Sequence, residues 1–308
     1  MDIGAQTDMN LKGAKAYFTC SNLDSGPTLK TKQNWLDSSE DEMTRRDREI
    51  PDTAPMNSNI EQHNREIHEN LEHWRRKPLL RRIYREFHHE IAARVKPNTP
   101  GIIAELGSGM GTIKECLPDC ITTDVFPNPW LDAVENAYAL TFKDASVGHL
   151  ILFDVWHHLE FPGTALREFH RVLKPGGRLI VFDPAMGLLG RIVFGLFHHE
   201  PLGLRNPITW EAPDLFLAGA HRYYAAQGNA SRIFGGEPFR GRLKDWDISE
   251  IRYFSGLAYL ASGGLRGPQL YPEALLPVLQ WTDRMLSRIP SLASRILVVL
   301  EKLDQSHT

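Results

Sequence analysis

The sequence predicts an α/β fold in which helices enclose a mainly parallel sheet. One observation is the alternation of short apolar runs with amphipathic stretches of helical periodicity. Buried parallel strands read as continuous apolar runs, and helices connect them. The other is a glycine-rich turn that directly follows the first of these runs. The four strand-like runs are residues 101–106, 121–124, 149–154 and 178–183.

Composition limits the classes of protein to be considered. The chain has 308 residues, 42% of them apolar and 24% charged, as in one large globular domain or one domain with an insertion. A net charge of −3 gives no support to a nucleic-acid partner. The three cysteines, Cys20, Cys116 and Cys120, are too few for a disulfide framework, and their spacing is not that of a zinc ribbon. We therefore expect reduced thiols and a cytoplasmic protein.

The start of the chain carries no targeting signal that we recognise. Its first ten residues lack the basic start and apolar stretch of a secretory signal. Residues 1–58 are polar and lack periodic apolar positions, so we expect a poorly ordered leader. No apolar run reaches the length of about 18 residues that a membrane span needs. We thus expect no stable membrane insertion.

Residues 59–98 have the apolar spacing of helices, and we expect an N-terminal helical lid. Pro78 should divide the segment into two helices because proline breaks or kinks a helix. The polar side is rich in Arg and His. Such a face is typical of solvated helices, but it would also suit a lid whose cations attract an anionic acceptor. The apolar positions recur at gaps of three to five: Ile67, Leu71, Trp74, Leu79, Ile83, Phe87 and Ile91.

Residues 99–184 hold all four strand-like runs, and we expect them to form the ligand-binding core. Beyond them the pattern loosens over residues 185–245, where a helix is expected at 212–227. Residues 246–308 should complete the sheet. Within them we expect a strand from Ile248, a helix over 272–289 and a final strand over 294–300.

The glycine-rich turn is the strongest local signal. It reads Glu105-Leu-Gly107-Ser108-Gly109-Met-Gly111 and precedes a helix expected at 112–116. Glycines let a backbone turn tightly and approach a ligand, and a helix N-terminus presents free N–H groups. Dinucleotide sites usually have the spacing G-x-G-x-x-G, whereas this turn has G-x-G-x-G. A carboxylate two residues before it suits a ligand with an ammonium group and no pyrophosphate, such as S-adenosylmethionine.

An acidic residue ends the next strand. Asp124 lies 19 residues after Glu105, at the place where a Rossmann-type site holds the two ribose hydroxyls. An aspartate that merely ends a strand in a turn would look the same when taken alone. Its position after the glycine turn favours the binding role.

Five segments in this order and spacing resemble the class I S-adenosylmethionine-dependent methyltransferases. The resemblance is to the small-molecule, type 11 group that includes ubiquinone and menaquinone biosynthesis enzymes, and it covers about residues 100–184. It implies a Rossmann-like seven-stranded sheet with an N-terminal helical lid and an insertion after the fifth strand. The matching segments are ELGSGMG at 105–111, TTDV at 122–125, NAYALTF at 136–142, FDVWHHL at 153–159 and LKPGGRLIVFD at 173–183.

The resemblance also implies roles for individual residues. Glu105 and the turn through Gly107, Ser108, Gly109 and Gly111 would hold the methionine part of the cofactor. Asp124 would hold the ribose, while Val125 and Phe126 would pack on the adenine.

Two further pairs are assigned to the cofactor in the same way. Relatives have Asp-Ala where this chain has Asn136-Ala137, and an Asn carbonyl oxygen can still accept from the adenine amino group. Phe153 and Asp154 end the fourth strand, beside the ligand crevice.

His157 and His158 follow the fourth strand on the expected acceptor side. Methyl transfer to a hydroxyl benefits from a base, and we assign that role to His157. The alternative is that the pair only shapes the local turn. His198-His199-Glu200 could suggest a metal, but no further ligand cluster is evident in the sequence, so we expect none.

The insertion is rich in aromatic residues and is where relatives determine acceptor specificity. It could form an ordinary small core or an apolar wall over a lipid-like or aromatic acceptor. Its apolar stretch 188–197 leaves room for a peripheral membrane contact. The aromatic residues are Phe194, Phe197, Trp210, Phe216, Tyr223, Tyr224 and Phe234.

The sequence thus favours methyl transfer to O, N or C of a small, apolar or glycosidic molecule. One rival is a nicotinamide-dependent oxidoreductase on a similar fold. Another is a family member that binds the cofactor without catalysis and serves as a partner subunit. The sequence does not indicate the acceptor or the oligomeric state.

Overall fold

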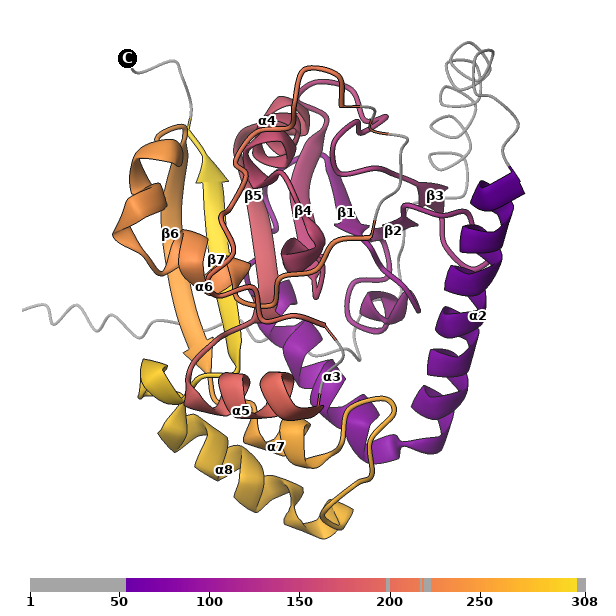
Figure 1. The fold of residues 1–308 in the computed structure, drawn as a ribbon, viewed down its shortest axis with the longest axis vertical. Coiled ribbons are helices and arrows are strands. Elements are labelled where there is room, and N and C mark those ends of the chain that lie inside the picture. The colour runs from indigo at the N-terminus through magenta and orange to yellow at the C-terminus, as the bar shows by residue number, and fades with distance from the viewer. Residues whose placement is uncertain (1–53, 198–199, 217, 219–222, 304–308) are drawn as a thin grey trace, which may run out of the picture.

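A computed structural model describes residues 54–197, 200–216, 218 and 223–303. Its centre is a seven-stranded sheet with the strand order β3-β2-β1-β4-β5-β7-β6 (Figure 1). Strands β1 to β5 are parallel, and β7 runs antiparallel between β5 and β6. The order reverses between β1 and β4, which makes their carboxyl ends the topological switch point where open α/β sheets bind ligands.

The strands have the following bounds: β1 Ile102–Leu106, β2 Ile121–Asp124, β3 Ala133–Val134, β4 Val147–Phe153, β5 Leu173–Pro184, β6 Trp246–Phe254 and β7 Arg295–Lys302. The four strand-like runs of the sequence are β1, β2, β4 and β5. The predicted α/β fold is confirmed, and β6 and β7 from the C-terminal part of the chain belong to the same sheet.

Both faces of the sheet are covered. Side chains of successive strand residues point to opposite faces, so each strand contributes to both cores. In β4, Leu150 and Leu152 pack with α4 (Pro162–Val172) and α6 (Asn229–Phe234). The intervening Ile151 packs on the other face with α3 (Pro78–Ala92). Each face thus forms its own apolar core.

The N-terminal segment forms two helices, as predicted, and they meet at Pro78. Helix α2 (Ala54–Arg76) stands at the edge of the molecule beside β2 and β3, whereas α3 lies against the sheet (Figure 1). Proline fits the first turn of α3, where its missing N–H costs no hydrogen bond. Residues 1–53 of the expected leader lie outside the described residues, and α2 already includes residues 54–58.

The insertion after β5 contains α5 (Leu188–Phe197), α6 and the 3₁₀ helix η4 (Glu237–Arg242). The helix expected at 212–227 is wrong, since the described residues of that stretch form turns and extended chain. Their backbone groups bond to distant segments, as the Ala226 N–H does to the His157 carbonyl and the Gln227 N–H to that of Pro201. A helix would have used those groups internally.

The remaining elements are short helices. They are η2 (Thr112–Glu115), η3 (Trp156–His158), α7 (Leu257–Ala261), η5 (Glu273–Leu275), α8 (Leu276–Leu286) and η6 (Pro290–Leu292). The helix expected at 112–116 is thus a single 3₁₀ turn. Among the described residues, no helix combines the length and apolar character that crossing a membrane requires.

Candidate functional site

The glycine-rich turn leads from the end of β1 into η2, at the switch point of the sheet. Gly107, Gly109 and Gly111 have φ values of 66°, 51° and 67°, the left-handed region that side chains disfavour. A Cβ on Gly107 would lie 2.5 Å from Cγ2 of Val155. Glycine is therefore required here both for its conformation and for its size.

Neighbouring strands fix the turn in place. The Ser108 N–H donates to the carbonyl of Thr123 at 2.7 Å, and the Ser108 hydroxyl donates to that of Glu105 at 3.1 Å. The turn is thus tied to both β1 and β2, and it has little freedom to change shape when a ligand binds.

Glu105 lies beneath the turn with 3% of its surface exposed. Among the described residues, its Oε2 atom is buried without a hydrogen-bond partner. Burial raises the pKa of Glu105 to about 8, and the nearby Asp124 carboxylate adds to the rise. A cationic partner would stabilise the ionised form of Glu105 and so offset the effect of burial on its pKa.

Asp124 ends β2 and is 5% exposed. Its Oδ2 accepts from the Gly109 N–H at 3.2 Å, and its Oδ1 accepts from the Val125 N–H at 2.7 Å. These bonds hold the carboxylate next to the glycine turn. Glu105 and Asp124 therefore converge on one place, as the sequence predicts.

Helix α2 covers this place, which the sequence did not indicate. Nε2 of His63 lies 3.5 Å from Oδ2 of Asp124, and the His63 ring contacts the Phe126 ring at 5.1 Å between centroids. The Asp124 carboxylate raises the pKa of His63 and outweighs the opposing effect of burial. Ile67 lies 3.5 Å from the position of a Cβ on Gly109. The lid expected at 59–98 thus reaches the turn through α2.

Two predicted adenine contacts lie at the far side of β2. The Asn136 side chain donates from Nδ2 to the Ala218 carbonyl at 2.6 Å and accepts from the Tyr138 N–H at 2.9 Å. Ala137 packs at the edge of the core beneath. Asn136 is thereby tied to the insertion, and its adenine contact stays a prediction.

Phe153 and Asp154 are in place at the end of β4, but each has protein partners. The Phe153 ring packs against Tyr84 of α3 at 5.4 Å between centroids. Asp154 has a φ of 58° and forms an ion pair with Arg295, which is buried at the start of β7. Neither residue is therefore free of other contacts, and their cofactor roles also stay predictions.

His157 lies in η3, directly after β4, and is 4% exposed. Its Nδ1 lies 2.9 Å from Oδ1 of Asp183 on β5, and its Nε2 lies 3.4 Å from Oε2 of Glu200. His158 lies beside it, with ring centroids 4.1 Å apart. The structure thus brings together side chains from β5, η3 and the insertion.

These contacts shift the ionisation of the two rings in opposite directions. Burial lowers the pKa of His157, but the Asp183 and Glu200 carboxylates overcome that effect and raise it to about 10. Burial and the neighbouring His157 lower the pKa of His158 to about 4. Without further ligands, His157 is thus protonated near neutral pH, so its role as a base remains a prediction.

The sequence placed Glu200 in another triplet, with His198 and His199, which lie outside the described residues. Its partners His157 and His158 instead come from η3, 43 and 42 residues earlier in the chain. Sequence spacing carries no signal for such a contact, because it depends on how the insertion folds back over β4.

The aromatic residues of the insertion divide between the two predicted roles. Phe234 is buried and packs against Trp156 in the core, with ring centroids 4.7 Å apart. The Tyr223 ring instead lies 5.7 Å from that of His158 and is mostly exposed. The part of the insertion near His158 is therefore available to contact an acceptor.

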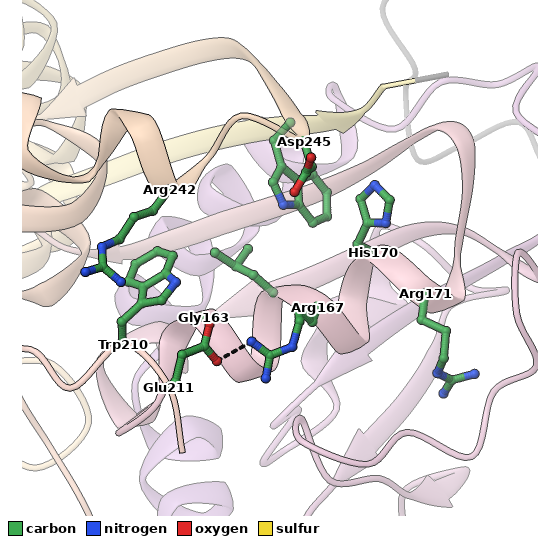
Figure 2. Close-up of a pocket in the computed structure, with 10 residues that line it drawn as sticks. Gly163, Arg167, His170, Arg171, Trp210, Glu211, Arg242 and Asp245 are labelled. Carbon is green, nitrogen blue, oxygen red and sulfur yellow. Dashed lines mark hydrogen bonds and ion pairs between the residues drawn. The ribbon is translucent and has the colours of Figure 1, made fainter. Parts of the chain in front are cut away.

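A pocket of about 430 Å³ lies elsewhere, along the outer side of α4 (Figure 2). It is lined by Arg167, Trp210, Arg242 and neighbouring residues, and none of the predicted site residues contributes to it. Arg167 forms an ion pair with Glu211, and Arg242 lies over the Trp210 ring. Its cations are thus engaged with the protein itself.

Comparison with known proteins agrees with this geometry. Residues 106–181 match the family model described as "Methyltransferase domain". The chain is also 49% identical over 47 residues to the uncharacterized protein YafE of Escherichia coli. That stretch is 15% of this chain and 23% of the relative, so the alignment spans about a quarter of the curated protein.

Solved structures of similar architecture include three chains of low identity. A SAM-dependent methyltransferase from Archaeoglobus fulgidus has 14% identity and a TM-score of 0.44, covering 72% of this chain and 94% of that one. Geranyl diphosphate C-methyltransferase from Streptomyces coelicolor has 10% identity and a TM-score of 0.44, and the match covers 72% of this chain and 80% of that one. The third chain comes from the complex of the Haloferax volcanii Trm112 methyltransferase activator with a methyltransferase. It has 17% identity and a TM-score of 0.41, and the match covers 71% of this chain and 89% of that one.

Similarity at this level says nothing about a substrate. The family match spans β4, most of β5 and the turn between β1 and β2, which are the parts that form the glycine turn and its switch point. Residues 106–181 of this chain are therefore similar to a methyltransferase domain.

Proposed function

We propose that this protein transfers the methyl group of S-adenosylmethionine to a small-molecule acceptor. The observation that carries the proposal is the buried, unpartnered Oε2 of Glu105 beneath a left-handed glycine turn, one strand from Asp124. A dinucleotide would bring a pyrophosphate to this turn, and its negative charge would oppose ionisation of the buried Glu105 further. An ammonium group would instead offset the cost of ionising Glu105.

The residues near the turn fit the two ends of this cofactor. Glu105 and the backbone of Gly107 to Gly111 would hold the amino acid end. Asp124 would hold the ribose hydroxyls, with Phe126 beside the adenine. Since His63 faces the same carboxylate oxygen, α2 would have to shift as the ribose enters.

The cofactor would supply a methyl group on a sulfonium, which is already activated for transfer. A bond would form from the acceptor atom to the methyl carbon as the sulfur–methyl bond breaks, and the bonding electron pair would stay on sulfur. The protein then has two tasks, which are to align the acceptor with the methyl group and to accept the proton that the acceptor loses.

The cluster of His157, His158 and Glu200 lies at the carboxyl end of β4, on the acceptor side of the proposed site. The insertion 185–245 would cover the acceptor, with Tyr223 at its edge. We expect His157→Ala to reduce turnover by about 100-fold or more, the usual contribution of a positioned proton-transfer group, with cofactor affinity unchanged. Near-normal turnover by that variant would remove His157 from the reaction.

The exposed surface of α8 favours an apolar acceptor. On α8 and just after it, Val278, Trp281, Met285 and Ile289 recur at gaps of three and four and are all exposed. The exposed Arg284 and Arg288 lie on the same stretch. An apolar stripe flanked by arginines suits the surface of an anionic membrane, from which a lipid-like acceptor could be taken.

The test of the proposed function uses full-length protein with S-adenosylmethionine labelled in the methyl group. A metabolite extract, prepared in parallel with a lipid extract, supplies the acceptors, and labelled products are identified by mass spectrometry. We expect label in a small molecule in the presence of wild-type protein only. Cofactor binding without any labelled product would instead favour a non-catalytic partner subunit.

Measurements of cofactor binding distinguish the proposed methyltransferase from the oxidoreductase alternative. Calorimetry with NADH and NADPH should give no binding, whereas S-adenosylhomocysteine should bind one site per chain. Binding of a nicotinamide cofactor at the glycine turn would reverse the assignment.

A further inference from the structure

The cluster on the acceptor side has the arrangement of a metal site. The three side chains of His157, His158 and Glu200 each offer one ligand atom, and these atoms lie within 4.8 Å of one another. They come from η3 and from the chain after α5, so the fold brings them together without any local sequence motif. Two imidazoles and a carboxylate are typical ligands of zinc and neighbouring transition metals.

The distances leave room for one small cation. Nε2 of His157 lies 3.4 Å from the Glu200 carboxylate, and Nε2 of His158 lies 3.8 Å from its other oxygen. In a tetrahedral zinc site with bonds of about 2.0–2.1 Å, neighbouring ligand atoms are about 3.4 Å apart. The two nitrogen–oxygen distances are thus close to that spacing, and all three donor atoms lie within 4.8 Å of one another.

Both rings are oriented from behind in the manner of metal ligands. Nδ1 of His157 bonds to the Asp183 carboxylate and Nδ1 of His158 to the Tyr224 carbonyl, each at 2.9 Å. Because a carbonyl oxygen only accepts, Nδ1 of His158 carries the hydrogen. Nε2 of the neutral ring then has a lone pair. Such outer partners fix the tautomer and orientation of metal-bound histidines.

The His158–Glu200 contact is unfavourable when taken alone. Two groups that both offer lone pairs face each other there, with no hydrogen between them in the neutral ring. The Tyr223 hydroxyl and the Gln227 amide donate to Glu200 and hold it in this position. A cation between the rings and the carboxylate would turn this unfavourable contact into an attractive one.

We propose that His157, His158 and Glu200 bind one Zn²⁺ ion, with Asp183 orienting His157. Three protein ligands leave a fourth position open, as in catalytic rather than structural zinc sites. That position can be reached from solvent, since the side chains of Glu200 and His158 are 19% and 35% exposed. An acceptor hydroxyl or thiol could bind there and lose its proton to solvent, in which case His157 would act as a ligand and not as the base. Only this last step rests on the proposed function.

The test is calorimetric titration of full-length, tag-free protein with ZnCl₂ alone. We expect one Zn²⁺ per chain for the wild type and loss of that binding in Glu200→Gln and His158→Ala. Asp183→Asn, which keeps the shape of the side chain, should weaken binding by about 10- to 100-fold. His68→Ala is the matched control, because His68 is exposed on α2 outside the cluster, and it should bind as the wild type does.

Absorption spectra provide a second measurement. Co²⁺ added in place of zinc should give the strong visible bands of a four-coordinate site in the wild type and in His68→Ala, but not in Glu200→Gln. Circular dichroism of each variant checks that it is folded. The proposal is overturned if folded wild-type protein binds no stoichiometric zinc, or if the cluster variants bind zinc as the wild type does. Binding of S-adenosylhomocysteine, measured in parallel, reports separately on the proposed function.

Discussion

Glu105 is the residue on which the cofactor assignment most depends. Its folded pKa of about 8 is above the ordinary value of 4.5, so the folded state binds an extra proton between these values. A group with a raised acidic pKa makes the fold less stable as pH rises through that window. Without ligand, the free energy of unfolding should fall between pH 5 and pH 9 by at most about 5 kcal/mol from this group.

Urea unfolding of the wild type and of Glu105→Gln at the two pH values measures this contribution. The variant has no titrating group at this position, so its stability should change less between pH 5 and pH 9. Equal pH dependence of the two proteins would show that Glu105 is not held in a desolvated state.

Gly107 is a residue of the turn at which both the backbone conformation and the surrounding space disfavour a side chain. Its φ is 66°, and Cγ2 of Val155 lies 2.5 Å from the position that a Cβ would occupy, so Gly107→Ala introduces both backbone strain and a clash. We expect a loss of about 1–3 kcal/mol in the free energy of unfolding, together with weaker binding of S-adenosylhomocysteine. Thermal unfolding and calorimetry measure the two effects.

Gly241 offers the matched control for this substitution. A Cβ there has no neighbour within 4 Å, so Gly241→Ala should change stability by less than about 1 kcal/mol. If Gly107→Ala were as stable as Gly241→Ala and bound the ligand equally well, the turn would not have the constraint described.

At the scale of elements, α2 lies over Asp124. His63 on this helix faces the carboxylate oxygen that we assign to the ribose, and its pKa is raised by that contact. Protonated His63 pairs with Asp124 and would compete with the ribose hydroxyls. The His63→Ala variant should therefore bind S-adenosylhomocysteine more tightly than the wild type at pH 6, by about 3- to 10-fold.

The comparison between the two proteins at two pH values isolates this effect. At pH 8, where His63 is less protonated, the affinity ratio of variant to wild type should be closer to one. Protonation of Glu105 affects both proteins alike and cancels in the ratio. A ratio that does not change between pH 6 and pH 8 would contradict the role given to α2.

Elements marked by a local sequence pattern, such as an apolar run or a proline, could be predicted from the sequence. Elements whose conformation depends on long-range contacts could not. The runs that became β1, β2, β4 and β5 are short, apolar and separated by helical patterns, and Pro78 does divide α2 from α3. The stretch 212–227 has helix-compatible residues but bonds its backbone to His157 and Pro201 instead. Such long-range bonds override local propensity.

The same distinction applies to the site. Glu105, the glycines and Asp124 follow strands at fixed spacing, so the sequence indicates that they converge. Glu200, His63 and Arg295 reach the site from the insertion, from α2 and from β7, at sequence distances that no motif encodes. Their contacts follow only from the packing of whole elements around the sheet.

At the scale of the whole molecule, α5 and α8 carry many of the exposed apolar side chains. Both helices lie in the lower part of the view in Figure 1, with α5 above α8. On α5, Leu188, Ile192 and Leu196 are exposed at gaps of four, which places them on one face. Together with the stripe on α8, this surface should bind anionic vesicles.

Sedimentation with vesicles of phosphatidylglycerol measures this binding. Simultaneous Trp281→Ala and Met285→Ala substitutions should reduce the bound fraction severalfold, because they remove apolar area that would enter the lipid interface. Leu270→Ala is the control, since Leu270 is 73% exposed but lies outside α8. Equal binding by all three proteins would exclude this surface as the contact.

The central claim is that the switch point of the sheet binds an adenosyl sulfonium compound through Glu105 and Asp124. Calorimetric titration of the full chain with S-adenosylhomocysteine tests it most directly. We predict one site per chain, with affinity about 10- to 100-fold lower in Glu105→Gln because a charge-assisted hydrogen bond is lost. No binding by the folded wild type, or the same affinity in wild type and variant, would contradict it.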